Sequence, residues 1–100
     1  SMKMLNVTFS NGKVFEIPVE VIAKHRAKYY AERETDSAQE FEEKFEEEVA
    51  YALEDDLALL DWASNNMDWE DVQDDAVQIR TEPVEKSEEW VNADKDIVEV

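Results

Sequence analysis

The chain has 100 residues, a formal net charge of −17, no cysteine and a single glycine. This length fits one domain with a modest core, and the missing cysteines exclude disulfides, thiol catalysis and cysteine-ligated zinc or iron–sulfur sites. An apolar content of 43% with 10% aromatic residues excludes full disorder. No apolar run approaches the roughly 20 residues that a membrane span needs, and no signal pattern opens the chain, so we expect a cytoplasmic protein.

The charge is distributed unevenly along the chain. Residues 1–31 sum to +3, whereas residues 32–100 sum to −20. Such a chain is repelled by nucleic acid and by anionic membranes, and it is steered toward basic partners at low salt. We therefore expect no direct nucleic-acid binding, no membrane binding and a protein partner with a basic surface.

The segment Met4–Pro18 predicts a β-hairpin. Leu5, Val7 and Phe9 alternate with polar residues, and Asn11–Gly12 is a strong signal for a two-residue turn in which both residues have positive φ. Since two strands alone are unstable in water, one face of the hairpin must be covered.

A helix with a basic outer face follows, from about Pro18 to Glu34. Proline suits the first turn of a helix. One stripe of this helix is apolar (Val19, Ile22, Ala23, Ala27, Tyr30 and Ala31) and the other side is basic (Lys24, His25, Arg26, Lys28 and Arg33). The basic stripe contains an aromatic residue and could contact nucleic acid. We favour the alternative that it offsets the acidic helix next to it.

The stretch 37–64 predicts a long acidic helix. We expect the other elements of the chain to be arranged around it. Ser37 and Glu40 form a capping-box pattern, and Phe41, Phe45 and Val49 begin an apolar stripe of helical period. Residues 54–56 are either an exposed turn of this helix or the cap of a second one. The stripe is expected to continue through Leu57, Leu60 and Ala63.

Beyond Asn65–Asn66 the sequence predicts three further segments. Asp68 caps a short helix, with Asp71 at its third position, and the alternation in residues 77–81 predicts a strand that could join the hairpin. Residues 82–100 form an acidic tail. This tail is either loosely ordered, which we favour, or docked through Trp90 and Val91 on its own fold or on a neighbouring subunit.

The motifs of common chemistries are not complete in this sequence. His25 has no neighbouring nucleophile and acid in the spacing of a triad, so it is interpreted as a solvated surface histidine. A calcium loop that opens at Asn92 would need a glycine where Ile97 stands. A catalytic pair of carboxylates has no positive support. We therefore predict that the protein is not an enzyme and has no cofactor and no specific metal site.

The acidic helix instead raises the hypothesis of nucleic-acid mimicry. Residues 40–48 hold six acids and one lysine, one net charge per about 2.7 Å at a helical rise of about 1.5 Å per residue. Duplex DNA carries one per about 1.7 Å. The alternative is a helix exterior that is simply solvated. The candidate partner-binding residues are Glu42, Glu43, Glu46, Glu47, Asp55, Asp56, Trp90 and Val91.

Two blocks of sequence carry a family resemblance: LNVTFSNGKVFEIPVEVIAKHRAKYYAE, residues 5–32, and YALEDDLALLDWASNNMDWEDVQDDAVQI, residues 51–79. Together they resemble small acidic accessory proteins of T4-like tailed phages that infect marine cyanobacteria. The match covers more than half of the chain and depends on the order of hairpin, basic helix and the stretch NNMDWEDV. The resemblance implies a phage accessory protein in a bacterial cytoplasm, without an established activity or functional residues to carry over.

These observations predict an α+β fold in which a hairpin, three-stranded if residues 77–81 join it, packs against two or three helices. The domain is expected to span residues 1–81, followed by the tail 82–100. Two functions fit: a non-enzymatic interaction module, self-associating or bound to a host or phage protein, and a nucleic-acid mimic that inhibits a host enzyme.

Overall fold

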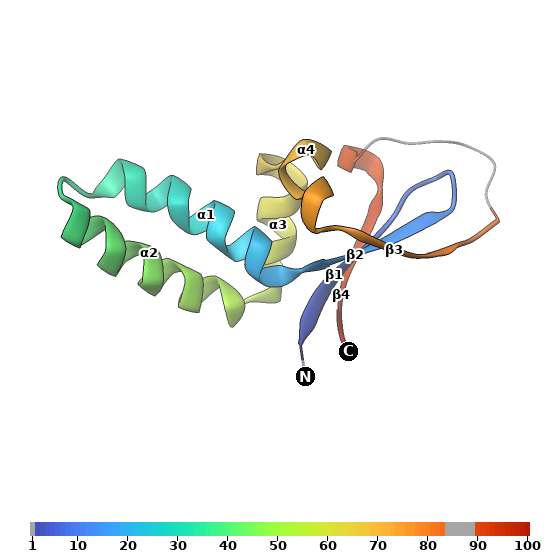
Figure 1. Cartoon of the computed structure of the whole chain (residues 1–100), viewed down its shortest axis with the longest axis horizontal. Helices are drawn as coiled ribbons and strands as arrows, with labels where there is room; N and C mark the ends of the chain where they lie inside the picture. Colours follow the sequence, from blue (N-terminus) through green and yellow to red (C-terminus); the bar gives the residue numbers. More distant parts are fainter. Residues whose placement is uncertain (1, 84–89) are drawn as a thin grey trace.

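The computed structural model describes residues 2–83 and 90–100. Their fold is α+β, as the sequence predicts, and has overall dimensions of 49 × 27 × 22 Å. Two long helices form an arm at one end, and an antiparallel sheet with the shorter helices occupies the other end (Figure 1).

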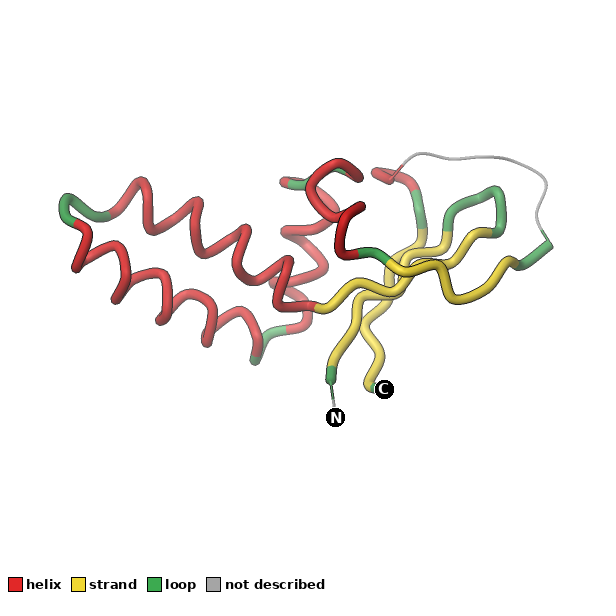
Figure 2. The backbone as a smooth tube through the Cα atoms, in the orientation of Figure 1, coloured by secondary structure: helices red, strands yellow, loops and turns green. Residues whose placement is uncertain are grey.

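The sheet contains the predicted hairpin and the predicted third strand. Its strands are β1 (Lys3–Thr8), β2 (Lys13–Pro18), β3 (Val77–Thr81) and β4 (Asp94–Glu99). They are all antiparallel and lie in the order β3-β2-β1-β4. The hairpin therefore forms the centre of the sheet, and the two C-terminal strands form its edges (Figure 2).

The hairpin turn differs from the predicted two-residue turn. Only Gly12 has a positive φ, at 89°. The Gly12 amide donates to the Phe9 carbonyl at 2.9 Å, and the Phe9 amide donates to the Lys13 carbonyl at 3.0 Å. Asn11 stays in the ordinary region of φ because its side chain accepts a hydrogen bond from the Lys13 amide, at 3.0 Å, and one glycine then suffices to close a longer loop.

The first long helix, α1 (Val19–Glu34), confirms the predicted basic helix. The acidic stretch 37–64 follows the second of the two alternatives given for residues 54–56, the cap of a second helix. It is divided into α2 (Ala38–Leu53) and α3 (Asp56–Asn66). The break occurs because the Asp55 side chain caps α3 by accepting from the Ala58 amide at 3.1 Å.

This change of direction also changes which residues of α3 face the core. Of the expected stripe, Ala63 is buried and Leu60 packs against the core, whereas Leu57 is 78% exposed, and Leu59 and Trp62 are buried as well. Because a new helix starts a new phase of the 3.6-residue period, extending the stripe of α2 through residues 54 and 55 misplaced Leu57.

Among the described residues, three short helices complete the fold: α4 (Trp69–Val72), η1 (Gln73–Asp75) and η2 (Trp90–Asn92). As predicted, Asp68 precedes the first of them, and its amide donates to the Asp71 carboxylate at 2.8 Å.

The core lies between one face of the sheet and the helices. Leu5, Val7 and Ile17 point to this face, because side chains alternate along a strand, and they pack against buried residues of the helices. The helical side of the core consists of Val19, Ile22, Ala23, Ala52, Leu59, Trp62, Ala63, Met67, Val72 and Trp90.

Segment 90–100 is part of this domain, so the expected boundary at residue 81 and the favoured loose tail are wrong for the residues that the structure describes. Strand β4 pairs with β1 from Lys3↔Glu99 to Thr8↔Asp94, and the two chain ends lie side by side (Figure 1). The physical reason is that β1 would otherwise expose unpaired backbone groups along a sheet edge, and that Trp90 fills the core.

Candidate functional site

The first candidate site is the outer surface of α2. Glu42, Glu43, Glu46 and Glu47 are all exposed there, and we call these four residues the acidic face. They form two pairs that are one helical turn apart, since residues four apart lie above one another on a helix. At a rise of about 1.5 Å per residue, the acidic face carries one charge per about 2.3 Å of helix.

One ion pair of the arm lies between its two helices instead. Glu48 accepts from Arg26 of α1 at 3.1 Å, and both side chains are only about one-sixth exposed, at 16% and 15%. The Arg26 guanidinium also lies 4.8 Å from the ring centre of Tyr30 and 5.3 Å from that of Tyr51. Thus part of the basic stripe offsets the acidic helix, as we favoured from the sequence.

Among the described residues, no ion pair joins a cation to the acidic face. Lys44, the one cation of α2, lies 3.6 Å from Glu34 and 3.8 Å from Glu48 instead. The four carboxylates therefore face solvent as a group of like charges.

Asp55 and Asp56 are not part of this surface. Asp55 caps α3, and the Asp56 carboxylate accepts from Lys3 of β1 at 3.0 Å. The hydrogen bond and the charge of Asp56 raise the pKa of Lys3 above its ordinary value of 10.5. Both aspartates thus have structural partners at the junction between the arm and the sheet.

Trp90 and Val91 lie at the other end of the molecule from the arm. Trp90 is 4% exposed, and its indole N–H donates to the Ala63 carbonyl of α3 at 2.8 Å. Val91 is 65% exposed. The pair therefore divides into a core residue and a surface residue, so only Val91 can meet a partner directly.

The second candidate site is a pocket of about 580 Å³ between the hairpin turn and α4. Its apolar lining consists of Phe9, Phe15, Trp69, Trp90 and Val91. Lys13 and Asn11 lie on the hairpin side of the pocket, and Asp68 and Glu70 lie on the helical side. We call this feature the aromatic pocket.

The rings of the aromatic pocket pack around Trp69, edge to face with Phe9 and tilted against Phe15 and Trp90. The centre of the Trp69 ring lies 5.4 Å from that of Phe9, 4.9 Å from that of Phe15 and 6.4 Å from that of Trp90. Phe9, Phe15 and Trp69 are half-buried, so each ring is partly packed and partly open to solvent. The lining residues come from three distant segments of the sequence, the hairpin, residues 68–70 and residues 90–91, which is why the sequence did not reveal this site.

Lys95 of β4 lies behind Trp90. Its ammonium group is 4.5 Å from the centre of the Trp90 ring and donates to the Trp90 carbonyl at 2.6 Å and to the Ala93 carbonyl at 3.2 Å. Burial lowers the pKa of Lys95 below 10.5, against a smaller opposing effect of Asp94. The protein thus already holds one cation against an aromatic ring.

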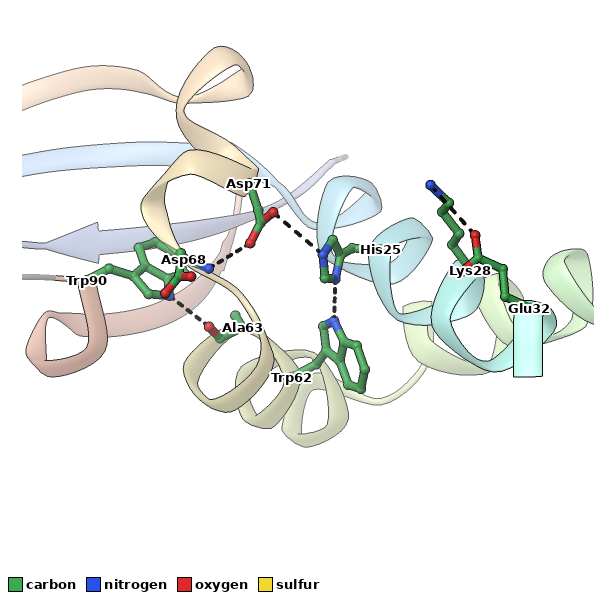
Figure 3. A network of polar contacts seen from close by, with 8 residues as sticks. All are labelled: His25, Lys28, Glu32, Trp62, Ala63, Asp68, Asp71 and Trp90. Atoms are coloured by element: carbon green, nitrogen blue, oxygen red, sulfur yellow. Dashed lines mark hydrogen bonds and ion pairs between the residues drawn. The ribbon is translucent and has the colours of Figure 1, made fainter. Parts of the chain in front are cut away.

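A polar network links α1, α3 and α4 (Figure 3). The Trp62 indole N–H donates to Nδ1 of His25 at 2.8 Å, and Nε2 of His25 lies 3.8 Å from the Asp71 carboxylate. The interpretation of His25 as a solvated surface histidine is therefore wrong, because the histidine bridges two elements that are remote in sequence. The ring thus connects α1 with α3 through a hydrogen bond and lies beside the Asp71 carboxylate of α4.

The described residues contain no group of three or more His, Asp or Glu side chains arranged to hold a metal ion. None of the described helices is long and apolar enough to cross a membrane. No protein-family model, no curated protein and no solved structure matches the chain. The two candidate sites, the acidic face and the aromatic pocket, thus have to be interpreted from their own chemistry.

Proposed function

We propose that this chain is a non-enzymatic protein-interaction module that binds a partner with a basic surface through the acidic face of α2. The observation that carries this proposal is the exposure of Glu42, Glu43, Glu46 and Glu47 on an arm that extends away from the sheet (Figure 1). Four carboxylates that form no ion pair with a described cation lie within about one and a half helical turns and create a strong local field, although Glu43 accepts a hydrogen bond from Gln39 at 3.3 Å. Such a field accelerates association with a cationic surface at low salt.

The resemblance to accessory proteins of cyanobacterial phages gives the biological setting of this proposal. The partner is then a host or phage protein in the bacterial cytoplasm. A small acidic protein with one projecting charged arm suits a role in occupying or masking a basic surface of that partner.

A nucleic-acid mimic is the second candidate, and the spacing of the acidic face favours it. One charge per about 2.3 Å of helix lies between the values of about 1.7 Å per charge for duplex DNA and about 3.4 Å along a single strand. In this case the basic partner surface is itself a nucleic-acid site, and duplex DNA competes with the protein for it.

The test is a capture experiment from host lysate with matched charge variants. The variant E42Q/E43Q/E46Q/E47Q removes the acidic face. The control E20Q/D74N/D75N/D96N removes four exposed carboxylates from other elements, so both variants change the net charge from −17 to −13. Captured proteins are identified by mass spectrometry across a salt series from about 50 to about 300 mM, over which the screening of exposed charges increases.

We expect the wild-type protein and the control to capture the same basic protein at low salt, and the acidic-face variant to lose it. Loss in both variants would mean that net charge alone drives capture, and retention in both would exclude the acidic face. Release of the captured protein by duplex DNA would support the nucleic-acid mimic. If duplex DNA does not release it, the result supports the protein-interaction module.

A further inference from the structure

The aromatic pocket lies at the opposite end of the molecule from the acidic face, and its composition points to a ligand of its own. Phe9, Phe15 and Trp69 expose part of their rings to this pocket. Aromatic faces carry a negative quadrupole and attract cations, and tryptophan does so most strongly.

The charged residues around the aromatic pocket add to this preference. Asp68 and Glu70 are exposed on the helical side of the pocket. Of the described residues that line the pocket, Lys13 is the one cation. The lining thus carries one net negative charge, within a protein of net charge −17, so a cationic group gains electrostatic energy on entering the pocket.

The arm contains internal examples of the same recognition. Arg26 lies against the rings of Tyr30 and Tyr51, and Arg33 lies 3.5 Å from the centre of the Tyr29 ring. In each case a planar guanidinium lies against an aromatic ring. The guanidinium is the cation that most often makes this contact in proteins.

We propose that the aromatic pocket binds an arginine side chain presented by a partner protein. The guanidinium stacks on the open part of the Trp69 ring, with Phe9 and Phe15 beside it. The carboxylates of Asp68 and Glu70 neutralise its charge from the helical side. A pocket of about 580 Å³ also has room for the backbone around such an arginine, since ligand pockets of this type range from about 300 to 1,000 Å³.

This site is independent of the acidic face and can be tested without knowing the partner. The probe is N-acetyl-arginine amide, titrated into the full-length protein while the three tryptophan indole N–H signals are followed by NMR. Trp62 lies outside the pocket lining and donates its indole N–H to His25, so its signal serves as the internal reference, whereas Trp90 is itself part of the lining. We expect the Trp69 signal to shift in a saturable way and the Trp62 signal to stay in place.

The controls separate charge from shape. N-acetyl-citrulline amide has the same shape without the charge and should bind about two- to fivefold more weakly, the factor of one exposed cation–π contact. The variant E70Q should weaken arginine binding, whereas D74N, which changes the net charge equally outside the lining, should not. The acidic-face variant E42Q/E43Q/E46Q/E47Q should bind arginine amide as the wild type does.

The proposal is overturned if the Trp69 signal does not move, or if citrulline amide binds as tightly as arginine amide. It is also overturned if N-acetyl-tryptophan amide binds more tightly than arginine amide, because the pocket then selects an aromatic ring. Loss of arginine binding in the acidic-face variant would assign the interaction to α2 and contradict a separate site.

Discussion

The arm and the sheet end of this molecule bury their apolar residues in different ways. In the arm, Ala23, Ala27 and Ala31 of α1 lie four residues apart and are fully buried, so small side chains let α2 approach closely. At the sheet end, large side chains such as Leu5, Ile17 and Trp90 fill the core.

This difference is reflected in the surfaces of the two ends. A narrow alanine seam leaves most of α2 free to carry charge, and the acidic face uses that freedom. The larger core of the sheet end includes aromatic rings that are only partly covered, and these form the aromatic pocket. Each candidate site therefore follows from the way in which its end of the molecule is packed.

The largest effect is expected at the sheet end, from Trp90→Ala. This variant removes a buried indole and leaves the Ala63 carbonyl without its partner, so the free energy of unfolding should fall by about 3–5 kcal/mol. Urea unfolding followed by circular dichroism measures it. Val91→Ala, at the exposed neighbour, should stay within about 0.5 kcal/mol. A decrease of less than about 1 kcal/mol in the free energy of unfolding for Trp90→Ala would contradict the packing of segment 90–100 in the core.

A smaller effect is expected in the arm, from Ala27→Leu. Ala27 has no exposed surface, so the added atoms push α1 away from α2, and overpacking of this kind costs about 1–3 kcal/mol. Ala50→Leu, at an exposed position of α2, is the matched control and should change stability by less than about 0.5 kcal/mol. Equal stability of both variants would contradict the close contact along the alanine seam.

The smallest effects are expected from the two lysines with shifted pKa values, whose contributions to the free energy of unfolding should change in opposite directions in alkaline solution. Burial lowers the pKa of Lys95 in the folded state, so the unfolded chain binds more protons and the contribution of Lys95 to stability should rise with pH up to about 10.5. Asp56 raises the pKa of Lys3. The contribution of Lys3 to stability should therefore be constant below about pH 10.5 and should decrease as the pH rises through the pKa of Lys3 in the folded state.

These opposite trends can be measured as differences in unfolding free energy between the wild type and Lys95→Met or Lys3→Met, between about pH 8 and pH 11.5. Slopes of the same sign for the two lysines would show that one of the assigned environments is wrong.

The elements that depend on local pattern could be predicted from the sequence. The hairpin, α1 and the capped starts of α2 and α4 follow from periodicity and from residues such as Ser37 and Asp68, which act on backbone groups three positions away. Even there, the hydrogen bond from the Lys13 amide to Asn11 changed the predicted turn.

The features that the sequence did not predict depend on residues that are distant in the chain. Strand β4 pairs Glu99 with Lys3, and the alternation in residues 94–99 is too polar to indicate a strand without its neighbour. The aromatic pocket likewise combines Phe9 with Trp69. Exposure of the acidic face, by contrast, followed from helical geometry alone.

If the acidic face binds a partner and does not stabilise the fold, the variant E42Q/E43Q/E46Q/E47Q should have a free energy of unfolding at least as high as that of the wild type. The substitutions remove two like-charged pairs four residues apart, 42 with 46 and 43 with 47, each worth about 0.2–0.5 kcal/mol of repulsion. We therefore predict an unfolding free energy that is unchanged or up to about 1 kcal/mol higher in urea titration. A loss of more than about 1 kcal/mol would show that these carboxylates hold the arm together, and would contradict their assignment to a partner.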